Sequence, residues 1–150
     1  MRALIQRVTS AKVSIEGITV GECGYGLLVY QSICCSDTET LTLKFIDKLL
    51  KLRLFPDDAG KTNWNIEQIS HDGRPKLLLI SNFSLYADLS KSLRPSFSSV
   101  KEFEEARIIY NKTIEVLSSK NIPFATGKFG GNMTVESISE VFNVILDINC

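Results

Sequence analysis

The chain has 150 residues, the length of one domain large enough to bury a hydrophobic core. Its hydrophobic content of 44% and charged content of 23% are typical of a globular protein. Seventeen basic residues balance 17 acidic ones, so the chain has no global field that attracts nucleic acid. We predict a single domain over residues 1–150, in which any RNA contact needs a local basic patch.

We expect no targeting signal in this sequence. No apolar run approaches the roughly 20 residues that cross a bilayer, and the start "MRALIQRVTS" lacks the apolar stretch of a signal peptide. These features predict a cytoplasmic protein without membrane contact. The cysteines Cys23, Cys34, Cys35 and Cys150 form no C-x-x-C pair, so we expect reduced structural thiols.

The first half predicts β structure followed by a helix. "ALIQRV" and "KVSIEG" are strand-like, Glu16-Gly17 suggests a hairpin turn, and "LLVYQSI" is a continuous apolar run. Apolar residues then recur at helical spacing from Leu41 to Leu52, with Ser36-Asp37 as the expected N-cap. The turn "RLFPDDAGK" ends this helix.

The second half adds strands and a second helix. "NWNIEQIS" predicts a short strand, and "KLLLISNFSLY" predicts a long central strand. The segment 98–120 is a clear amphipathic helix, and residues 124–148 read as a loop followed by two strands. The order predicts a mixed α/β fold, in which a mixed sheet carries two helices on one side.

Histidine is scarce, because His71 in the turn "SHDGRP" is the only one. A Ser-His or Cys-His site needs an imidazole within hydrogen-bond reach of the nucleophile, and zinc needs more ligands than this chain offers. The glycine-rich segments match neither a phosphate loop nor a dinucleotide fingerprint. The sequence therefore predicts no metal and no cofactor.

The stretch "SNFSLYADLSKSLRPSF", residues 81–97, carries polar groups where a core strand needs none. A straight strand would put Ser81, Phe83 and Leu85 on one face and the intervening residues on the other. Backbone N–H groups emerging there can hold a developing oxyanion, and Lys91 and Arg94 can meet a phosphate. An edge strand followed by a solvated turn explains the same pattern.

Five segments, in this order, resemble D-aminoacyl-tRNA deacylases: "MRALIQRVTSAKVSIEG", "GLLVY", "LRLFPDDAGKTNWNI", "SNFSLYADLSKSLRPSF" and "TGKFGGNMTV". The resemblance covers about residues 1–135. It implies a layered β/β/α fold and a cytoplasmic homodimer with paired sites at the subunit interface. It further implies hydrolysis of the ester that joins a D-amino acid, or glycine, to the 3′-terminal adenosine of tRNA.

The family motif Ser-Gln-Phe-Thr-Leu maps onto residues 81–85, so the resemblance assigns the catalytic region to Ser81, Asn82, Phe83 and Ser84. The family hydroxyl was first taken as a nucleophile, whereas later thinking gives much of the chemistry to the ribose 2′-OH of the tRNA. Backbone N–H groups around Phe83 and Ser84 would then polarise the ester carbonyl. This reading agrees with the lack of a base that activates a serine.

The resemblance also implies residues that bind substrate. Met133 matches a family methionine that forms a wall of the adenosine and aminoacyl pocket. Gln6 and Arg7 match an N-terminal Gln-Arg pair, whose arginine supports a second motif. The basic turn with Lys91 and Arg94 reaches toward tRNA.

The second family motif is altered in this chain. In the family, Gly and a cis-Pro enter the partner subunit's pocket, and their carbonyls reject L-amino acids. Here Val141 and Phe142 occupy this cross-subunit position. A cis bond before a residue other than proline costs about 3 kcal/mol, so we expect a trans strand in which Phe142 fills space.

Two readings follow from this departure. In the first, the chain is a working deacylase with an altered chiral filter. In the second, it is a diverged dimer that binds tRNA and hydrolyses little. A purely structural dimer is a third class, which would show neither RNA binding nor turnover.

Overall fold

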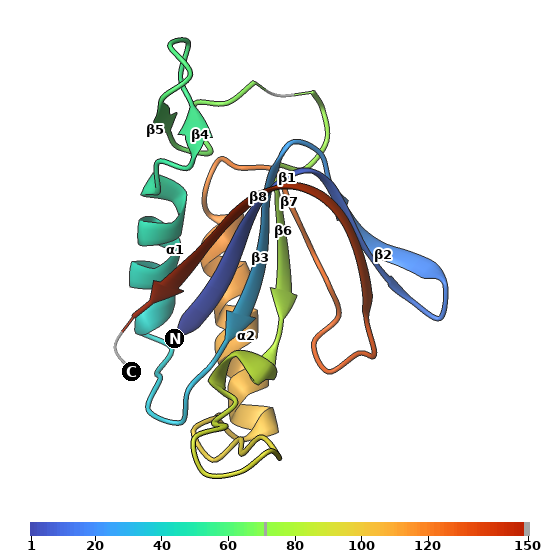
Figure 1. Cartoon of the computed structure of the whole chain (residues 1–150), viewed down its shortest axis with the longest axis vertical. Helices are drawn as coiled ribbons and strands as arrows, with labels where there is room; N and C mark the ends of the chain where they lie inside the picture. Colours follow the sequence, from blue (N-terminus) through green and yellow to red (C-terminus); the bar gives the residue numbers. More distant parts are fainter. Residues whose placement is uncertain (71, 149–150) are drawn as a thin grey trace.

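The computed structural model describes residues 1–70 and 72–148. Its elements, in chain order, are β1 (Arg2–Ile15), β2 (Ile18–Cys23), β3 (Gly26–Ser32), α1 (Leu41–Lys51), β4 (Phe55–Pro56), β5 (Thr62–Trp64), β6 (Leu77–Ser81), the 3₁₀ helix η1 (Phe83–Tyr86), α2 (Phe103–Ser118), β7 (Phe124–Thr126) and β8 (Thr134–Asp147). Figure 1 shows β8 crossing in front of the other strands, with α2 behind the sheet and α1 at its side. The mixed α/β prediction is confirmed.

The main sheet has six strands and both kinds of pairing. Its order is β2-β1-β3-β6-β7, and β8 pairs with β1 as well. β1 is antiparallel to β2, β3 and β8, whereas β3, β6 and β7 run parallel to one another. The sheet curls until a Cβ atom on Gly21 of β2 would lie 2.4 Å from the Thr126 carbonyl oxygen of β7. The sheet is therefore nearly closed.

The predicted hairpin forms at Glu16-Gly17. Ile15 pairs with Ile18 across a two-residue loop whose φ angles are 50° and 79°. Positive φ at both loop positions is the type I′ geometry that matches strand twist. The prediction of this turn from the sequence is confirmed.

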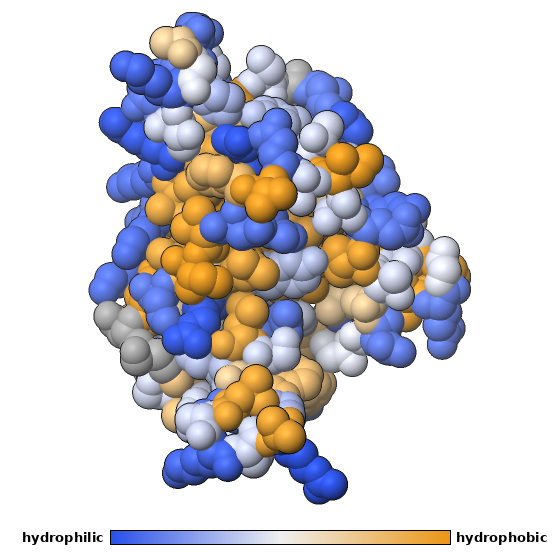
Figure 2. Space-filling model, in the orientation of Figure 1, coloured by the Kyte–Doolittle hydropathy of each residue, from blue (hydrophilic) through white to orange (hydrophobic). Residues whose placement is uncertain are grey.

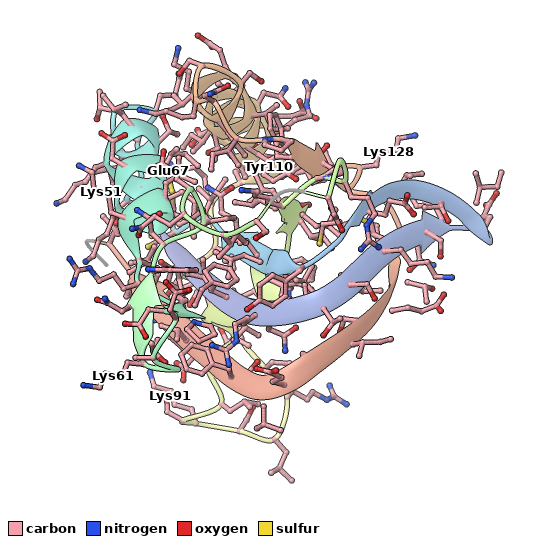
Figure 3. All side chains as sticks on the ribbon, turned by 90° about the horizontal axis from the view of Figure 1, so that it is seen from above. Lys51, Lys61, Glu67, Lys91, Tyr110 and Lys128 are labelled. Atoms are coloured by element: carbon pink, nitrogen blue, oxygen red, sulfur yellow. The ribbon has the colours of Figure 1, made fainter. Side chains whose placement is uncertain are left out.

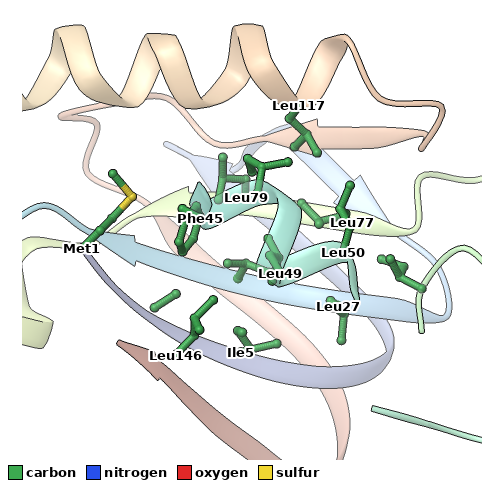
Figure 4. Close-up of a cluster of buried hydrophobic side chains, with 14 of the residues drawn as sticks. Met1, Ile5, Leu27, Phe45, Leu49, Leu50, Leu77, Leu79, Leu117 and Leu146 are labelled. Carbon is green, nitrogen blue, oxygen red and sulfur yellow. The ribbon is translucent and has the colours of Figure 1, made fainter. Parts of the chain in front are cut away.

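Both helices cover one face of the sheet. The helical stripe of α1 buries Phe45, Ile46, Leu49 and Leu50, and α2 buries Ala106, Ile109, Tyr110 and Leu117 in the same cluster. Figure 4 shows Phe45 and Leu49 packed beside Leu79 of β6 and Met1. Burying each of these side chains contributes about 1.5–3 kcal/mol, which fixes the helices against the strands.

Several local predictions are wrong. Asp37 does not cap α1, which begins after Thr40; it is buried, accepts a hydrogen bond from the Cys34 backbone N–H and pairs with the Met1 ammonium at 2.6 Å. The strand predicted over residues 63–70 is only β5, because Asn65 forms a side-chain-capped turn with Glu67 and Gln68.

The cysteines follow the prediction in part. Cys23 is buried and free, and Cys35 is exposed and free. Cys34 is disulfide-bonded, so the expectation that every cysteine is reduced is wrong for this residue. Cys150 and His71 lie outside the described residues. None of the described helices is long and apolar enough to span a membrane.

Candidate functional site

A pocket lies where the parallel strands end. β3 ends at Ser32 and β6 ends at Ser81, and parallel pairing brings these carboxyl ends to the same edge of the sheet. In sheets of this kind, ligands bind just outside the carboxyl ends of parallel strands. The start of α2 and the loop after β7 close the pocket from the other sides.

The pocket has a volume of about 410 Å³, within the range of small-molecule sites. Its residues come from four segments: Gln31, Ser32 and Ile33; Ser81, Asn82 and Phe83; Val100, Lys101, Phe103 and Ala106; Phe129, Gly130, Gly131 and Met133. Of the residues predicted from the sequence, Ser81, Asn82, Phe83 and Met133 therefore lie together around one cavity.

The chain turns sharply at Asn82. The Asn82 backbone N–H donates to the Gln31 carbonyl at 2.8 Å and thereby extends the β3–β6 ladder by one bond. The Asn82 side-chain oxygen accepts hydrogen bonds from the Ser84 N–H at 3.0 Å and from the Ser84 hydroxyl at 2.6 Å. Asn82 is thus the N-cap of η1, and the strand predicted to run through Tyr86 ends at Ser81.

This turn leaves a backbone donor of one pocket residue, Phe83, without a hydrogen bond among the described residues. The Phe83 N–H makes no hydrogen bond within the part of the chain that the structure describes, whereas the Phe83 carbonyl accepts one from the Ser32 hydroxyl at 3.3 Å. The Phe83 ring is 59% exposed and meets Phe97 edge-to-face at 4.9 Å between centroids. A residue that lines the pocket therefore carries both an unpaired backbone N–H, within the described residues, and an exposed aromatic contact.

The Ser84 hydroxyl bonds to an amide oxygen rather than to a base. An amide oxygen does not take up a proton, and Ser84 is not among the residues lining the pocket. Tyr86, in the same 3₁₀ helix, is buried, and burial raises the pKa of its hydroxyl far above the usual value. The described residues thus place no general base beside Ser84.

Gln6 and Arg7 lie away from the pocket. The Gln6 amide donates to the Asn143 side chain at 2.8 Å, and Arg7 donates to the Leu54 carbonyl at 2.8 Å. Arg7 also pairs with Glu140 and stacks over the Phe142 ring at 4.5 Å. Gln6 and Arg7 therefore hold β8 against β1 in this structure.

The altered motif forms a bulge in β8. Gln6 pairs with Asn143 and Val8 pairs with Ser139, so a two-residue step on β1 faces a four-residue step on β8. Glu140, Val141 and Phe142 bulge out opposite Arg7, and no peptide bond of the described residues is cis. The trans geometry is as predicted, but the strand is interrupted where the sequence suggested a plain one.

Val141 and Phe142 point to different environments. Val141 is 99% exposed at the top of the bulge. Phe142 is half-buried, packs on the main hydrophobic core and lies under Arg7. Phe142 therefore fills space within its own subunit, and Val141 is the member of the pair that projects outward.

Lys91 and Arg94 lie in the exposed loop that joins η1 to α2. They do not line the pocket, and neither side chain has an ion-pair partner within residues 1–70 and 72–148. The loop is held by reciprocal backbone bonds between Asp88 and Ser96 at 2.8 and 2.9 Å. Among the described residues, this loop therefore exposes two cations without ion pairs, outside the pocket lining.

Several pocket residues were missed by the sequence analysis. Lys101 donates to the Cys35 carbonyl at 2.8 Å and to Glu105 at 3.2 Å, and Phe103 and Phe129 form a tilted ring pair. Gln31 is buried, and its amide oxygen has no hydrogen-bond partner among the described residues. The sequence offered one signal for these residues, namely the ends of the apolar runs "GLLVYQS" and "KLLLIS". If these runs form parallel strands, their carboxyl ends lie at the same edge of the sheet, and the residues that follow them lie close together.

Known proteins resemble this chain along most of its length. The family model for D-Tyr-tRNA(Tyr) deacylase matches residues 4–141. The D-aminoacyl-tRNA deacylase of Saccharophagus degradans is 43% identical over 141 residues, covering 93% of this chain and 94% of the relative. That of Acinetobacter baumannii strain AYE is 41% identical over 140 residues, covering 93% and 92%.

Solved structures share this fold. A c-Myc DNA unwinding element binding protein superposes with a TM-score of 0.88 at 28% identity, over the whole of both chains. A probable eukaryotic D-amino acid tRNA deacylase shares the fold, with a TM-score of 0.80 at 15% identity over 98% of each chain. With a family model spanning nearly the whole chain and relatives above 40% identity, the protein belongs to the D-aminoacyl-tRNA deacylase family of ester hydrolases.

Proposed function

We propose that this chain hydrolyses the ester bond of D-aminoacyl-tRNA and releases the amino acid. The observation that carries the proposal is the pocket at the ends of β3 and β6, which gathers Ser81, Asn82, Phe83 and Met133. The relatives are named as enzymes that act on D-aminoacyl-tRNA. This chain has a cavity of about 410 Å³, and Phe83 in its lining has a backbone N–H without a partner among the described residues.

The Phe83 N–H would stabilise the developing oxyanion. A preorganised backbone donor is worth about 10²–10³-fold in rate when it meets the charge that forms on the attacked carbonyl. Because the described residues offer no base to Ser84, we infer that the ribose 2′-OH of the substrate assists the attack. The exposed Phe83–Phe97 pair gives the terminal adenine a surface on which to stack.

The active form would be a homodimer. Among the described strands, β8 pairs only with β1, so this 14-residue strand has no described partner along its other edge. Its outer side exposes Ile138, Val141 and Ile145, and Figure 2 shows hydrophobic side chains gathered over this front face. A long apolar edge strand is an aggregation hazard unless it is covered, and a second copy would cover it.

Val141 would be the residue that reaches the partner's pocket. Val141 lies in the middle of the bulge Glu140–Phe142, at the position of the Gly-cisPro pair of the family. Its side chain is fully exposed in the single subunit. A branched apolar side chain there replaces two carbonyls that reject L-amino acids. We therefore expect discrimination between D- and L-esters to be weaker than in a chain with Gly-cisPro.

The direct test is hydrolysis of matched D- and L-aminoacyl-tRNA, for example D- and L-tyrosyl esters, at micromolar protein. We expect release of the D-amino acid and measurable cleavage of the L-ester. Intact D-esters at this concentration would contradict the proposal and favour a tRNA-binding dimer without turnover. Strict D-selectivity would retain the enzyme and refute the altered filter.

The role of Ser84 has a separate prediction. Ser84→Ala removes the hydroxyl but keeps the hydrogen bond from the backbone N–H of residue 84 to the Asn82 side-chain oxygen. We therefore expect kcat to stay within about tenfold of the wild type. Steady-state hydrolysis of D-aminoacyl-tRNA measures it. A loss of about 10⁴-fold or more would instead identify Ser84 as the nucleophile.

A further inference from the structure

The outer face of α1 carries a stripe of lysines that no part of the pocket uses. Lys44, Lys48 and Lys51 are exposed and follow one another at helical spacing, i, i+4 and i+7. At about 100° per residue they fall within an arc of about 60°, and they span roughly 10 Å along the helix axis. Figure 3 shows Lys51 projecting from α1 on the side away from the sheet.

This stripe keeps its positive charge uncompensated. None of its three ammonium groups has an ion pair with a described residue. The one acid in α1, Asp47, accepts a hydrogen bond from Lys120 of the segment after α2 at 2.7 Å. That hydrogen bond is the largest cause of the lowered pKa of Asp47, and the charge of Lys51 adds a smaller attraction, so Lys120 is the main partner of this carboxylate.

A shallow groove of about 580 Å³ runs along the same face, lined by Thr40, Leu43, Lys44, Asp47, Lys48 and Lys51. The net charge of the chain is zero, so the attraction of a polyanion depends on local groups of positive charge such as this one. Phosphate-backbone contacts need such a row of unpaired cations.

The segment that leads into α1 is hydrogen-bonded to the wall of the pocket. Lys101, which lines the pocket, donates to the Cys35 carbonyl, and the Cys35 N–H donates to the Ser99 carbonyl at 2.9 Å. The short segment from Cys35 to Thr40 then leads directly into α1. A polyanion whose end enters the pocket can therefore pass onto this helix face.

We propose that the α1 stripe binds the phosphate backbone of the duplex stem next to the tRNA 3′ end. The proposal rests on the proposed function, because the 3′ end must occupy the pocket. The single-stranded end enters between β3, β6 and α2, and the stem lies along Lys44, Lys48 and Lys51. The contact is made to phosphates, so it is independent of the stem's sequence.

The test compares two triple variants that lose the same charge. In the first, Lys44, Lys48 and Lys51 are replaced by Gln, which keeps helix propensity. In the control, Lys12, Arg107 and Lys112 are replaced by Gln; each of these sits in a surface ion pair elsewhere. Both substrates are D-tyrosyl esters: one of full-length tRNA, the other of adenosine alone.

We expect the α1 variant to raise KM for full-length tRNA while kcat/KM for the adenosine ester stays at the wild-type value. The affinity for uncharged tRNA falls with salt, and each phosphate contact adds about 0.7–0.9 to the slope of log affinity against log salt concentration. Loss of three contacts should therefore reduce the magnitude of this slope by about two to three, which corresponds to roughly 20- to 40-fold in affinity between 50 and 200 mM salt. The control variant should keep both the slope and the KM.

The outcomes separate this inference from the proposed function. If the wild type cleaves neither ester, the proposed function fails, and binding of uncharged tRNA still decides the role of α1. If the α1 variant binds tRNA with the wild-type salt slope, the inference is overturned. It is also overturned if the three lysines are needed for binding anionic lipid vesicles but not for binding tRNA.

Discussion

Replacing Gly26 by alanine is expected to lower the free energy of unfolding by about 3–5 kcal/mol, a cost at the upper end for a single substitution. A Cβ atom at Gly26 would lie 1.8 Å from the Lys76 carbonyl oxygen and 2.6 Å from its carbon. That carbonyl also accepts the Leu27 N–H at 2.8 Å, so it cannot move without breaking the start of the β3–β6 pairing. Chemical denaturation followed by circular dichroism measures the change.

The matched control is Gly60→Asn in the turn between β4 and β5. Gly60 has φ of +75° and open space around its Cβ position, and asparagine tolerates this conformation. We expect the control to change the unfolding free energy by no more than about 0.5 kcal/mol. A Gly26→Ala protein as stable as the control would show that β3 and β6 do not approach as closely as described.

The sequence predicts elements well where the signal is local. The helical spacing from Leu41 to Leu52 and the type I′ turn at Glu16-Gly17 depend on residues close together in the chain, and both form as predicted. Asp37 shows the opposite case. Its position suggested a helix cap, but a buried ion pair with the Met1 ammonium takes its carboxylate instead. Partners 36 residues apart leave no pattern in the sequence.

The alternation in "ISNFSLY" misled for a related reason. Polar and apolar residues alternate as in a strand, but the Asn82 side chain hydrogen-bonds Ser84 and turns the backbone into a 3₁₀ helix. Asparagine competes with the strand by bonding to nearby backbone groups. The faces assigned to Phe83 and Ser84 were therefore wrong, although the segment was correctly selected.

The sequence predicted one segment of the pocket lining and missed most of the others. Residues 81–83 lie next to one another in the chain and carry a recognisable motif, so a single segment pointed to them. Gln31 lies in β3, Lys101 precedes α2 and Phe129 follows β7. Contacts between distant segments bring them together, because β3 and β7 both pair with β6 and the Lys101 N–H donates to the Ile33 carbonyl. Gln6 and Arg7, which match the N-terminal Gln-Arg pair of the family, lie away from the pocket, because β1 places them beside the β8 bulge.

Asn82→Ala is expected to lower kcat by about 100-fold, the scale of a lost oxyanion donor, with a smaller effect on KM. We expect Asn82 to contribute no group to the reaction itself. It positions the chain, because its side-chain oxygen holds the Ser84 N–H and hydroxyl and so fixes the turn that presents the Phe83 N–H to the pocket. Losing the cap costs only about 1 kcal/mol of stability, so the protein should remain folded.

Two variants distinguish positioning from a merely structural role. Asn82→Ser retains a side-chain oxygen that caps 3₁₀ and α-helices, and it should recover most of the lost kcat. Ser84→Ala removes one of the two bonds to Asn82 but leaves the backbone bond, so it should stay near wild type. If Asn82→Ala and Ser84→Ala lower kcat equally, the turn is held by other contacts and the Phe83 N–H does not depend on Asn82. If Asn82→Ser fails to recover activity although it is as stable as the wild type, the Asn82 amide itself meets the substrate, and the residue is catalytic rather than positioning.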